Sequence, residues 1–174
     1  MFEKIDILQP FFEDLTREYN VREFARLKKI TPATASKKLK EFSKQGLLSY
    51  RKERNLDLYK GNVDNVSFRD LKVYYTIHTL RKSGFIIALD EFYLKPTIVL
   101  YGSAAAGFDT YDSDIDILII SEKKDNFTDL LKFEKIFKKE IHLITVKKLN
   151  DLKNEHLVNN VINGIVLEGE LRWT

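Results

Sequence analysis

Two short stretches of this sequence combine residue types that could bind a metal ion and a phosphate group. Gly102 and Ser103 follow an apolar stretch, residues 97–101, that is typical of a buried strand. A tight turn after a strand presents backbone N–H groups that can bind phosphate oxygens. Ten residues later, Asp114 and Asp116 open a second apolar stretch. Side chains alternate along a strand, so both carboxylates face one side, where they and substrate phosphates would bind Mg²⁺.

The order Gly102-Ser103, ten residues, then Asp114-x-Asp116 resembles the signature of the nucleotidyltransferase fold. This is the DNA polymerase β superfamily, and the likeness is greatest to its minimal nucleotidyltransferases. The resemblance extends from about Gly84 to the C-terminus. It implies that a hydroxyl attacks the α-phosphorus of a nucleoside triphosphate (NTP) with Mg²⁺ as cofactor. Gly102 and Ser103 would then bind the triphosphate, and Asp114 and Asp116 the metal.

The resemblance also implies a third carboxylate on a later strand, at a position that corresponds here to His142. A neutral imidazole brings no negative charge and suits Mg²⁺ poorly. Glu140 lies two residues earlier on the same strand face. Glu140 and His142 are therefore both candidate catalytic residues, and an ordinary sheet position is an equal alternative for His142. We expect four other charged residues nearby to be solvated loop charges: Asp109, Asp112, Lys123 and Lys124.

Composition excludes several classes of protein. The chain has 174 residues, 44% of them hydrophobic, which is enough for one large domain or two small ones. It has no cysteine, and therefore no disulfide or thiolate metal site. No apolar run approaches the ~20 residues of a membrane span, and we see no signal peptide. We therefore expect a cytoplasmic protein without a membrane partner.

Positive charge is concentrated in the first half of the chain. Residues 21–82 hold sixteen Lys and Arg against six Asp and Glu, whereas the remainder holds thirteen against twenty. A basic segment of this kind is typical of a module that binds a polyanion, and a solvated lysine surface is the alternative.

The basic segment has the pattern of a winged helix-turn-helix. Asn20 and Thr31 are suited to cap helices over residues 21–27 and 32–45, and Gly46 suits the C-terminal end of the second helix. A hairpin is expected next, with strands 47–50 and 56–59 and a basic turn between them. Residues 20–60 resemble the winged-helix regulators of archaea and bacteria as a whole.

This pattern predicts binding to double-stranded DNA, with the second helix in the major groove and the basic turn along the backbone. A winged helix used for protein contacts or homodimerisation is the alternative. The candidate contact residues are Thr31, Thr34, Ser36, Lys37, Lys40, Arg51, Lys52 and Arg54.

We predict an α+β protein with three parts. Residues 1–66 form the winged helix-turn-helix domain, residues 67–83 a connecting helix capped by Ser67, and residues 84–174 a nucleotidyltransferase-like domain. In that last domain we expect a small mixed sheet covered by helices on one side. The other expected helices are 2–18, 85–94, 125–138 and 149–161, and the expected strands are 97–101, 115–120, 140–146 and 164–169.

Two hypotheses for the function follow. The first is a Mg²⁺-dependent enzyme that transfers a nucleoside monophosphate from an NTP to a hydroxyl of a protein, a small molecule or a nucleic acid. The second is a DNA-binding regulator whose degenerate nucleotidyltransferase-like domain binds a nucleotide or a protein, a hypothesis favoured by the missing third carboxylate. A neighbouring toxin is a further candidate partner, because minimal nucleotidyltransferases often work in such pairs.

Overall fold

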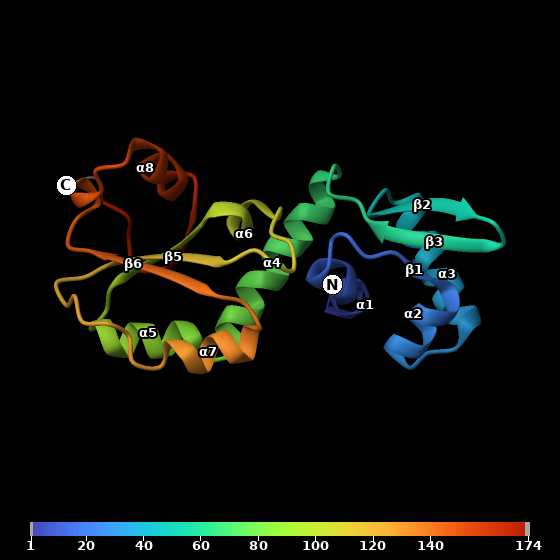
Figure 1. The fold of residues 1–174 in the computed structure, drawn as a ribbon, viewed down its shortest axis with the longest axis horizontal. Coiled ribbons are helices and arrows are strands. Elements are labelled where there is room, and N and C mark those ends of the chain that lie inside the picture. Colours follow the sequence, from blue (N-terminus) through green and yellow to red (C-terminus); the bar gives the residue numbers. More distant parts are fainter. Residues whose placement is uncertain (1, 173–174) are drawn as a thin grey trace. The chain divides into compact units, whose positions relative to one another are not determined.

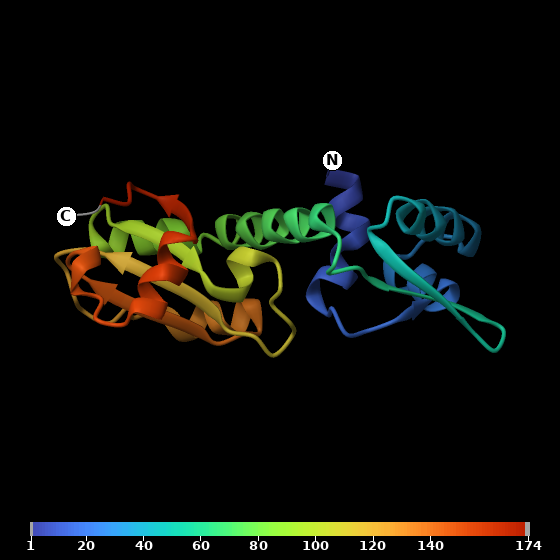
Figure 2. The same ribbon diagram turned by 90° about the horizontal axis from the view of Figure 1, so that it is seen from above.

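The computed structural model describes residues 2–172, and the chain divides into two compact units, Met1–Tyr75 and Thr76–Thr174. The boundary falls inside helix α4 (Val66–Lys82), which covers residues 67–82 of the connecting helix expected over 67–83. Figures 1 and 2 show the elements of each unit in two perpendicular views. Among residues 2–172, no helix combines the length and the apolar character needed to span a membrane.

Unit 1 packs its helices around an antiparallel sheet with the strand order β1-β3-β2. Its core is rich in aromatic rings, and Phe11 contacts both Tyr19 and Phe24 with ring centroids 5.2 and 5.5 Å apart. Apolar burial of this kind is the main stabilising term for so small a unit. The elements before α4 are α1 (Phe2–Glu13), β1 (Tyr19–Asn20), α2 (Val21–Lys28), α3 (Pro32–Lys44), β2 (Leu48–Glu53) and β3 (Leu56–Gly61).

The predicted starts of α2 and α3 are confirmed. The Asn20 side chain accepts a hydrogen bond from the Glu23 N–H, and the Glu23 carboxylate accepts one from the Asn20 N–H. This reciprocal capping satisfies N–H groups that have no partner within the helix. Thr31 caps α3 from one side only, because its hydroxyl accepts the Thr34 N–H, and Pro32 occupies the first position of the helix. Gly46 follows α3 with a φ of +73°, a conformation that glycine adopts easily.

Polar side chains move two helix ends in unit 1 away from the predicted residues. Helix α1 ends at Glu13 instead of residue 18, because the Asp14 carboxylate accepts the N–H groups of Thr16 and Arg17 and turns the chain. Helix α4 begins at Val66, so Ser67 lies inside it. The side chain of Asn65 accepts the Phe68 N–H and takes the capping role expected of Ser67.

The hairpin has longer strands and a shorter turn than predicted. Residues 51–53 continue β2 and pair with residues 56–58 of β3, so only Arg54 and Asn55 form the turn. Arg54 has a φ of +52°, which a two-residue hairpin turn requires. Arg51 and Lys52 therefore lie on a strand and not in a basic loop.

Unit 2 contains a four-stranded sheet with the order β6-β5-β4-β7. Strands β5 and β6 are parallel, whereas β4 is antiparallel to both β5 and β7, which confirms the predicted mixed sheet. The strands are β4 (Thr97–Tyr101), β5 (Ile115–Ile120), β6 (Ile141–Val146) and β7 (Ile165–Glu168). The helices are α5 (Phe85–Tyr93), α6 (Gly102–Ala106), α7 (Leu130–Phe137), the 3₁₀ turn η1 (Leu149–Asp151) and α8 (Glu155–Ile162).

Both faces of this sheet are covered, so the prediction of helices on one side only is wrong. Ile98 and Ile117 pack with α5 and α7 in one cluster, whereas Val99 and Leu118 pack with η1 and α8 in another. Figure 1 shows α5 and α7 on one side of β5 and β6, and α8 on the other. The near-continuous apolar sequences of β4 and β5 are typical of strands buried on both faces.

Two predicted helices of unit 2 are shorter than expected. The predicted helix over residues 149–161 is divided into η1 and α8, because the Asp151 carboxylate accepts N–H groups at the start of η1 and the Asn154 side chain caps α8. Helix α7 begins at Leu130 and not near residue 125. Local side-chain hydrogen bonds of this kind compete with a continuous helix.

Candidate active site

The junction of β4 and α6 brings the backbone close to the start of β5. Gly102 has a φ of +72°, and a Cβ atom at this position would overlap the Asp116 Oδ2 atom. Helix α6 begins at Gly102, so the expected Gly-Ser turn is the first turn of a short helix. The first N–H groups of a helix have no partner within it, so they remain able to bind an anion.

Asp114, Asp116 and His142 converge on one face of the sheet. Asp116 pairs in register with Tyr101 on β4 and with His142 on β6, so the side chains of Tyr101, Asp116 and His142 share that face. The His142 Nε2 atom lies 3.3 Å from Asp114 Oδ2, and its Nδ1 atom lies 3.4 Å from Asp116 Oδ1. A single imidazole thus bridges the two carboxylates that the sequence singles out.

Glu140, the residue directly before β6, extends this group. Ligand atoms of Asp114, Glu140 and His142 all lie within 4.8 Å of one another, a spacing that allows a metal ion to be held between them. The side chains of Glu140 and His142 are exposed and that of Asp114 is half-buried, so the group is open to solvent on one side. Both candidates for the third position, Glu140 and His142, therefore lie beside Asp114.

Burial sets the electrostatic character of Asp116. The Asp116 side chain is about one quarter exposed, at 25%. Burial raises the pKa of Asp116, an effect that His142 opposes and the nearby charge of Asp114 reinforces. Burial and the Asp116 charge also raise the pKa of Tyr101 to about 12, so its hydroxyl stays protonated. A cation bound beside Asp116 would relieve the cost of its negative charge.

Two of the expected loop charges have defined partners, so that expectation is wrong for them. Asp109 is 5% exposed, and its Oδ2 atom accepts a hydrogen bond from Lys139 Nζ at 2.9 Å. Lys123 donates to the Phe92 carbonyl at 2.9 Å and lies 3.6 Å from the centre of the Phe92 ring. No sequence signal pointed to the first contact, because Asp109 and Lys139 are 30 residues apart.

The candidate nucleic-acid residues differ in whether their side chains already form ion pairs within the protein. Lys37 and Lys40 on α3 are exposed, as are Lys52 and Arg54 of the hairpin. Arg51 is also exposed, but its guanidinium forms ion pairs with Glu18 and Glu53 at 2.5 and 2.6 Å.

The α3 start is partly committed to capping, and Ser36 is half-buried. The Thr31 hydroxyl accepts the Thr34 N–H at 3.2 Å and lies 2.9 Å from the Thr34 hydroxyl. The four lysine and arginine side chains at positions 37, 40, 52 and 54 are therefore the strongest candidates for contact with phosphates.

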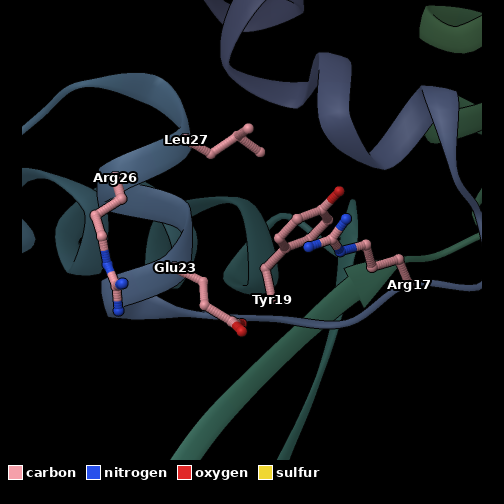
Figure 3. A pocket seen from close by; sticks show the side chains of 5 residues that line it. All are labelled: Arg17, Tyr19, Glu23, Arg26 and Leu27. Atoms are coloured by element: carbon pink, nitrogen blue, oxygen red, sulfur yellow. The ribbon is translucent and has the colours of Figure 1, made fainter.

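A shallow hollow of about 360 Å³ lies on unit 1 beside α2. Its lining residues are Arg17, Tyr19, Glu23, Arg26 and Leu27. The Arg17 guanidinium lies across the ring of Tyr19, 4.8 Å from its centre (Figure 3). The Glu23 carboxylate also accepts the N–H of Asn20, the capping residue of α2, so the carboxylate of the hollow already has a structural role.

Residues 95–170 match the family model described as Polymerase beta, Nucleotidyltransferase. The matched segment runs from the start of β4 to the end of β7, so it contains the whole sheet of unit 2 and every candidate residue of the acidic group. The match supports the nucleotidyltransferase superfamily for this domain. No curated protein was found to match the chain.

Proposed function

We propose that this protein transfers a nucleoside monophosphate from an NTP to a hydroxyl acceptor, and that its first unit is a winged helix that binds double-stranded DNA. The observation that carries the catalytic part is the convergence of Asp114 and Asp116 on His142 against Gly102. The family match over the surrounding residues supports a nucleotidyltransferase domain.

The donor atoms of the group fit magnesium. Mg²⁺ prefers oxygen ligands and is usually bound by one or two carboxylates together with substrate phosphates. Asp114 and Asp116 supply such carboxylates, and Glu140 is near enough to Asp114 to add another. A bound magnesium ion would neutralise the charge that develops on the transferred phosphoryl group.

Besides holding the metal ion, the residues of the chain would bind the leaving group and accept a proton. The N–H groups at the start of α6, at Gly102 and Ser103, would bind the oxygens of the leaving pyrophosphate. The acceptor hydroxyl oxygen forms a bond to the α-phosphorus, and the bond from that phosphorus to the bridging oxygen breaks. The proton of the hydroxyl passes to a base, for which His142 and Glu140 are the candidates.

The first test asks whether the acidic group binds a divalent cation. The chain has three histidines, so the imidazole NMR signals are few. Paramagnetic Mn²⁺, used in place of Mg²⁺, should broaden the signals of His142 at lower Mn²⁺ concentrations than those of His78 and His156. In Asp116→Asn, the same broadening should need about tenfold or more Mn²⁺, because a ligand is lost. Equal broadening of all three histidines would contradict the proposed site.

The second test asks whether the chain is an enzyme. Each α-labelled NTP is incubated with the protein and Mg²⁺, and label transfer and pyrophosphate release are measured. Loss of the signal in Asp116→Asn would assign the activity to this group. Binding of NTP and Mg²⁺ without turnover would instead favour the regulator.

That second candidate function rests on His142. A DNA-binding regulator whose nucleotidyltransferase-like domain binds a nucleotide or a protein needs no third carboxylate, and histidine stands at the position where the family resemblance implies one. In this alternative the winged helix supplies the output. Proposed partners include a protein acceptor, a toxin and a second copy of the chain.

The DNA-binding proposal rests on the order of elements and the charge of unit 1. Helices α2 and α3 are followed by a two-stranded hairpin, which is the arrangement expected of a winged helix-turn-helix. Lys37 and Lys40 are exposed on α3, and Lys52 and Arg54 are exposed on the hairpin. These cations would neutralise DNA phosphates.

A further inference from the structure

A largely buried ion pair links the two segments that carry the acidic group. Lys139 Nζ donates a hydrogen bond to Asp109 Oδ2 at 2.9 Å and another to the Thr110 carbonyl at 2.6 Å. Asp109 is 5% exposed, and the side chain of Lys139 is 17% exposed. Water and salt screen a pair in this environment only weakly, so it can fix the positions of both segments.

On one side the pair fixes the loop that leads to Asp114. The Thr110 carbonyl accepts the Ser113 N–H at 3.2 Å as well as the Lys139 ammonium. The Ser113 hydroxyl accepts the Thr110 N–H at 2.8 Å and closes the turn. Asp114 is the next residue, so the direction in which its carboxylate leaves the loop depends on this turn.

On the other side the pair fixes the chain around Glu140. The Lys139 N–H donates to the Glu134 carbonyl, and the Glu134 carboxylate accepts the Ile141 N–H at 3.0 Å. Glu140 lies between these two anchored residues, and β6 begins directly after it and carries His142. Lys139 directly precedes Glu140, and its side chain contacts the loop before Asp114, so one residue connects the two segments.

We infer that Lys139 is a positioning residue: its ion pair with Asp109 sets the distance between Asp114 and the Glu140–His142 edge of β6, and thereby the affinity of the group for a divalent cation. This inference rests on the proposed function, because the spacing matters for affinity only if the group binds a cation. A merely structural ion pair would affect stability and leave the affinity unchanged.

The decisive variant is the double substitution Lys139→Met with Asp109→Asn. It removes both charges together, because removing one would leave the other buried without its partner. Its Kd for Mn²⁺, measured by broadening of the His142 signals, should rise about tenfold or more, as for other groups that orient metal ligands. Lys139→Arg keeps the charge and the donors, so it should restore most of the affinity.

The chain offers a matched control in Lys147 and Glu122, an exposed ion pair with an N–O distance of 2.7 Å that follows the other ends of β5 and β6. The variant Lys147→Met with Glu122→Gln should leave the Mn²⁺ affinity as it is. If the Lys139 double variant does not fold, Lys139→Gln with Asp109→Asn replaces it, because this pair also removes both charges while the glutamine amide keeps a donor for the Thr110 carbonyl.

Each outcome separates this inference from the proposed function. A lower melting temperature with an unchanged Mn²⁺ affinity would show a purely structural role and overturn the inference. If the unsubstituted protein shows no selective broadening of His142, the proposed metal site fails. Faster hydrogen exchange of the Ser113 and Ile141 amides in the double variant would then still support the link between the two segments, and unchanged exchange would refute it.

Discussion

At the scale of single residues, the candidate site depends on Gly102 as much as on the carboxylates. Its φ of +72° turns the chain from β4 into α6, and its lack of a side chain leaves room for Asp116. Asp116 in turn lies in register with His142. A glycine needed only for its positive φ would not also have to leave room for a neighbouring carboxylate.

Gly102→Ala should therefore weaken metal binding as well as stability, whereas an ordinary glycine substitution at positive φ affects stability alone. The left-handed conformation costs an alanine about 1–2 kcal/mol, and the new methyl group also displaces the Asp116 carboxylate. Gly84→Ala is the matched control, because Gly84 has a φ of +80° and a Cβ atom added there would meet no other atom within 4 Å. We expect similar losses of stability in thermal melts, but weaker Mn²⁺ binding only in Gly102→Ala. Equal Mn²⁺ binding by both variants would contradict this role.

At the scale of elements, strand pairing redistributes the charges of the hairpin. Because β2 continues to Glu53, Arg51 lies on a strand beside its partners Glu18 and Glu53. Lys52 is the next residue, and its side chain is exposed. Arg51 and Lys52 are adjacent in sequence, but the charge of Lys52 is more accessible to a polyanion than that of Arg51.

Lys52→Ala should weaken the binding of a DNA duplex more than Arg51→Ala. The Lys52 ammonium can approach a phosphate at little cost, whereas Arg51 would first have to leave two carboxylates. We expect Lys52→Ala to cost a few-fold in Kd, as for one phosphate contact, and Arg51→Ala to cost less. Fluorescence anisotropy on one labelled duplex measures both. A larger loss in Arg51→Ala would mean that DNA displaces its partners.

At the scale of the whole molecule, positive charge is concentrated in one segment of the chain. Residues 21–82 have an excess of ten positive charges, while the net charge of the whole chain is only +3. A polyanion is therefore attracted to one part of the chain and repelled by the rest. The net charge of the chain does not indicate this uneven distribution.

Duplex binding by the full chain should fall steeply with salt. If about four phosphates are neutralised, log K should fall with log salt concentration with a slope of about −3.6 between 50 and 200 mM. Lys37→Ala should make this slope smaller by about 1. An affinity that does not change with salt would exclude the proposed electrostatic contact and favour the alternative use of unit 1 in protein contacts.

Sequence reasoning succeeded where short-range physics decides the structure. The caps at Asn20 and Thr31, the strands β4 and β5, and the shared face of Asp114 and Asp116 follow from hydrogen bonds and side-chain alternation within a few residues. Sequence reasoning failed where a polar side chain outside the helices set a helix end, as Asp14 does after α1 and Asn154 does before α8. Several such residues lie near each helix end, and composition does not select among them.

The sequence by itself determined the order of the elements, the acidic pair and the basic segment, because each depends on residues that are close together in the chain. Only the tertiary structure decided that one imidazole bridges both aspartates, that Lys139 reaches Asp109, and that Arg51 is held by Glu18. With 29 basic and 26 acidic residues, the chain allows very many ion pairs. Which of them form depends on where distant segments meet, and that is fixed by the packing of the hydrophobic clusters.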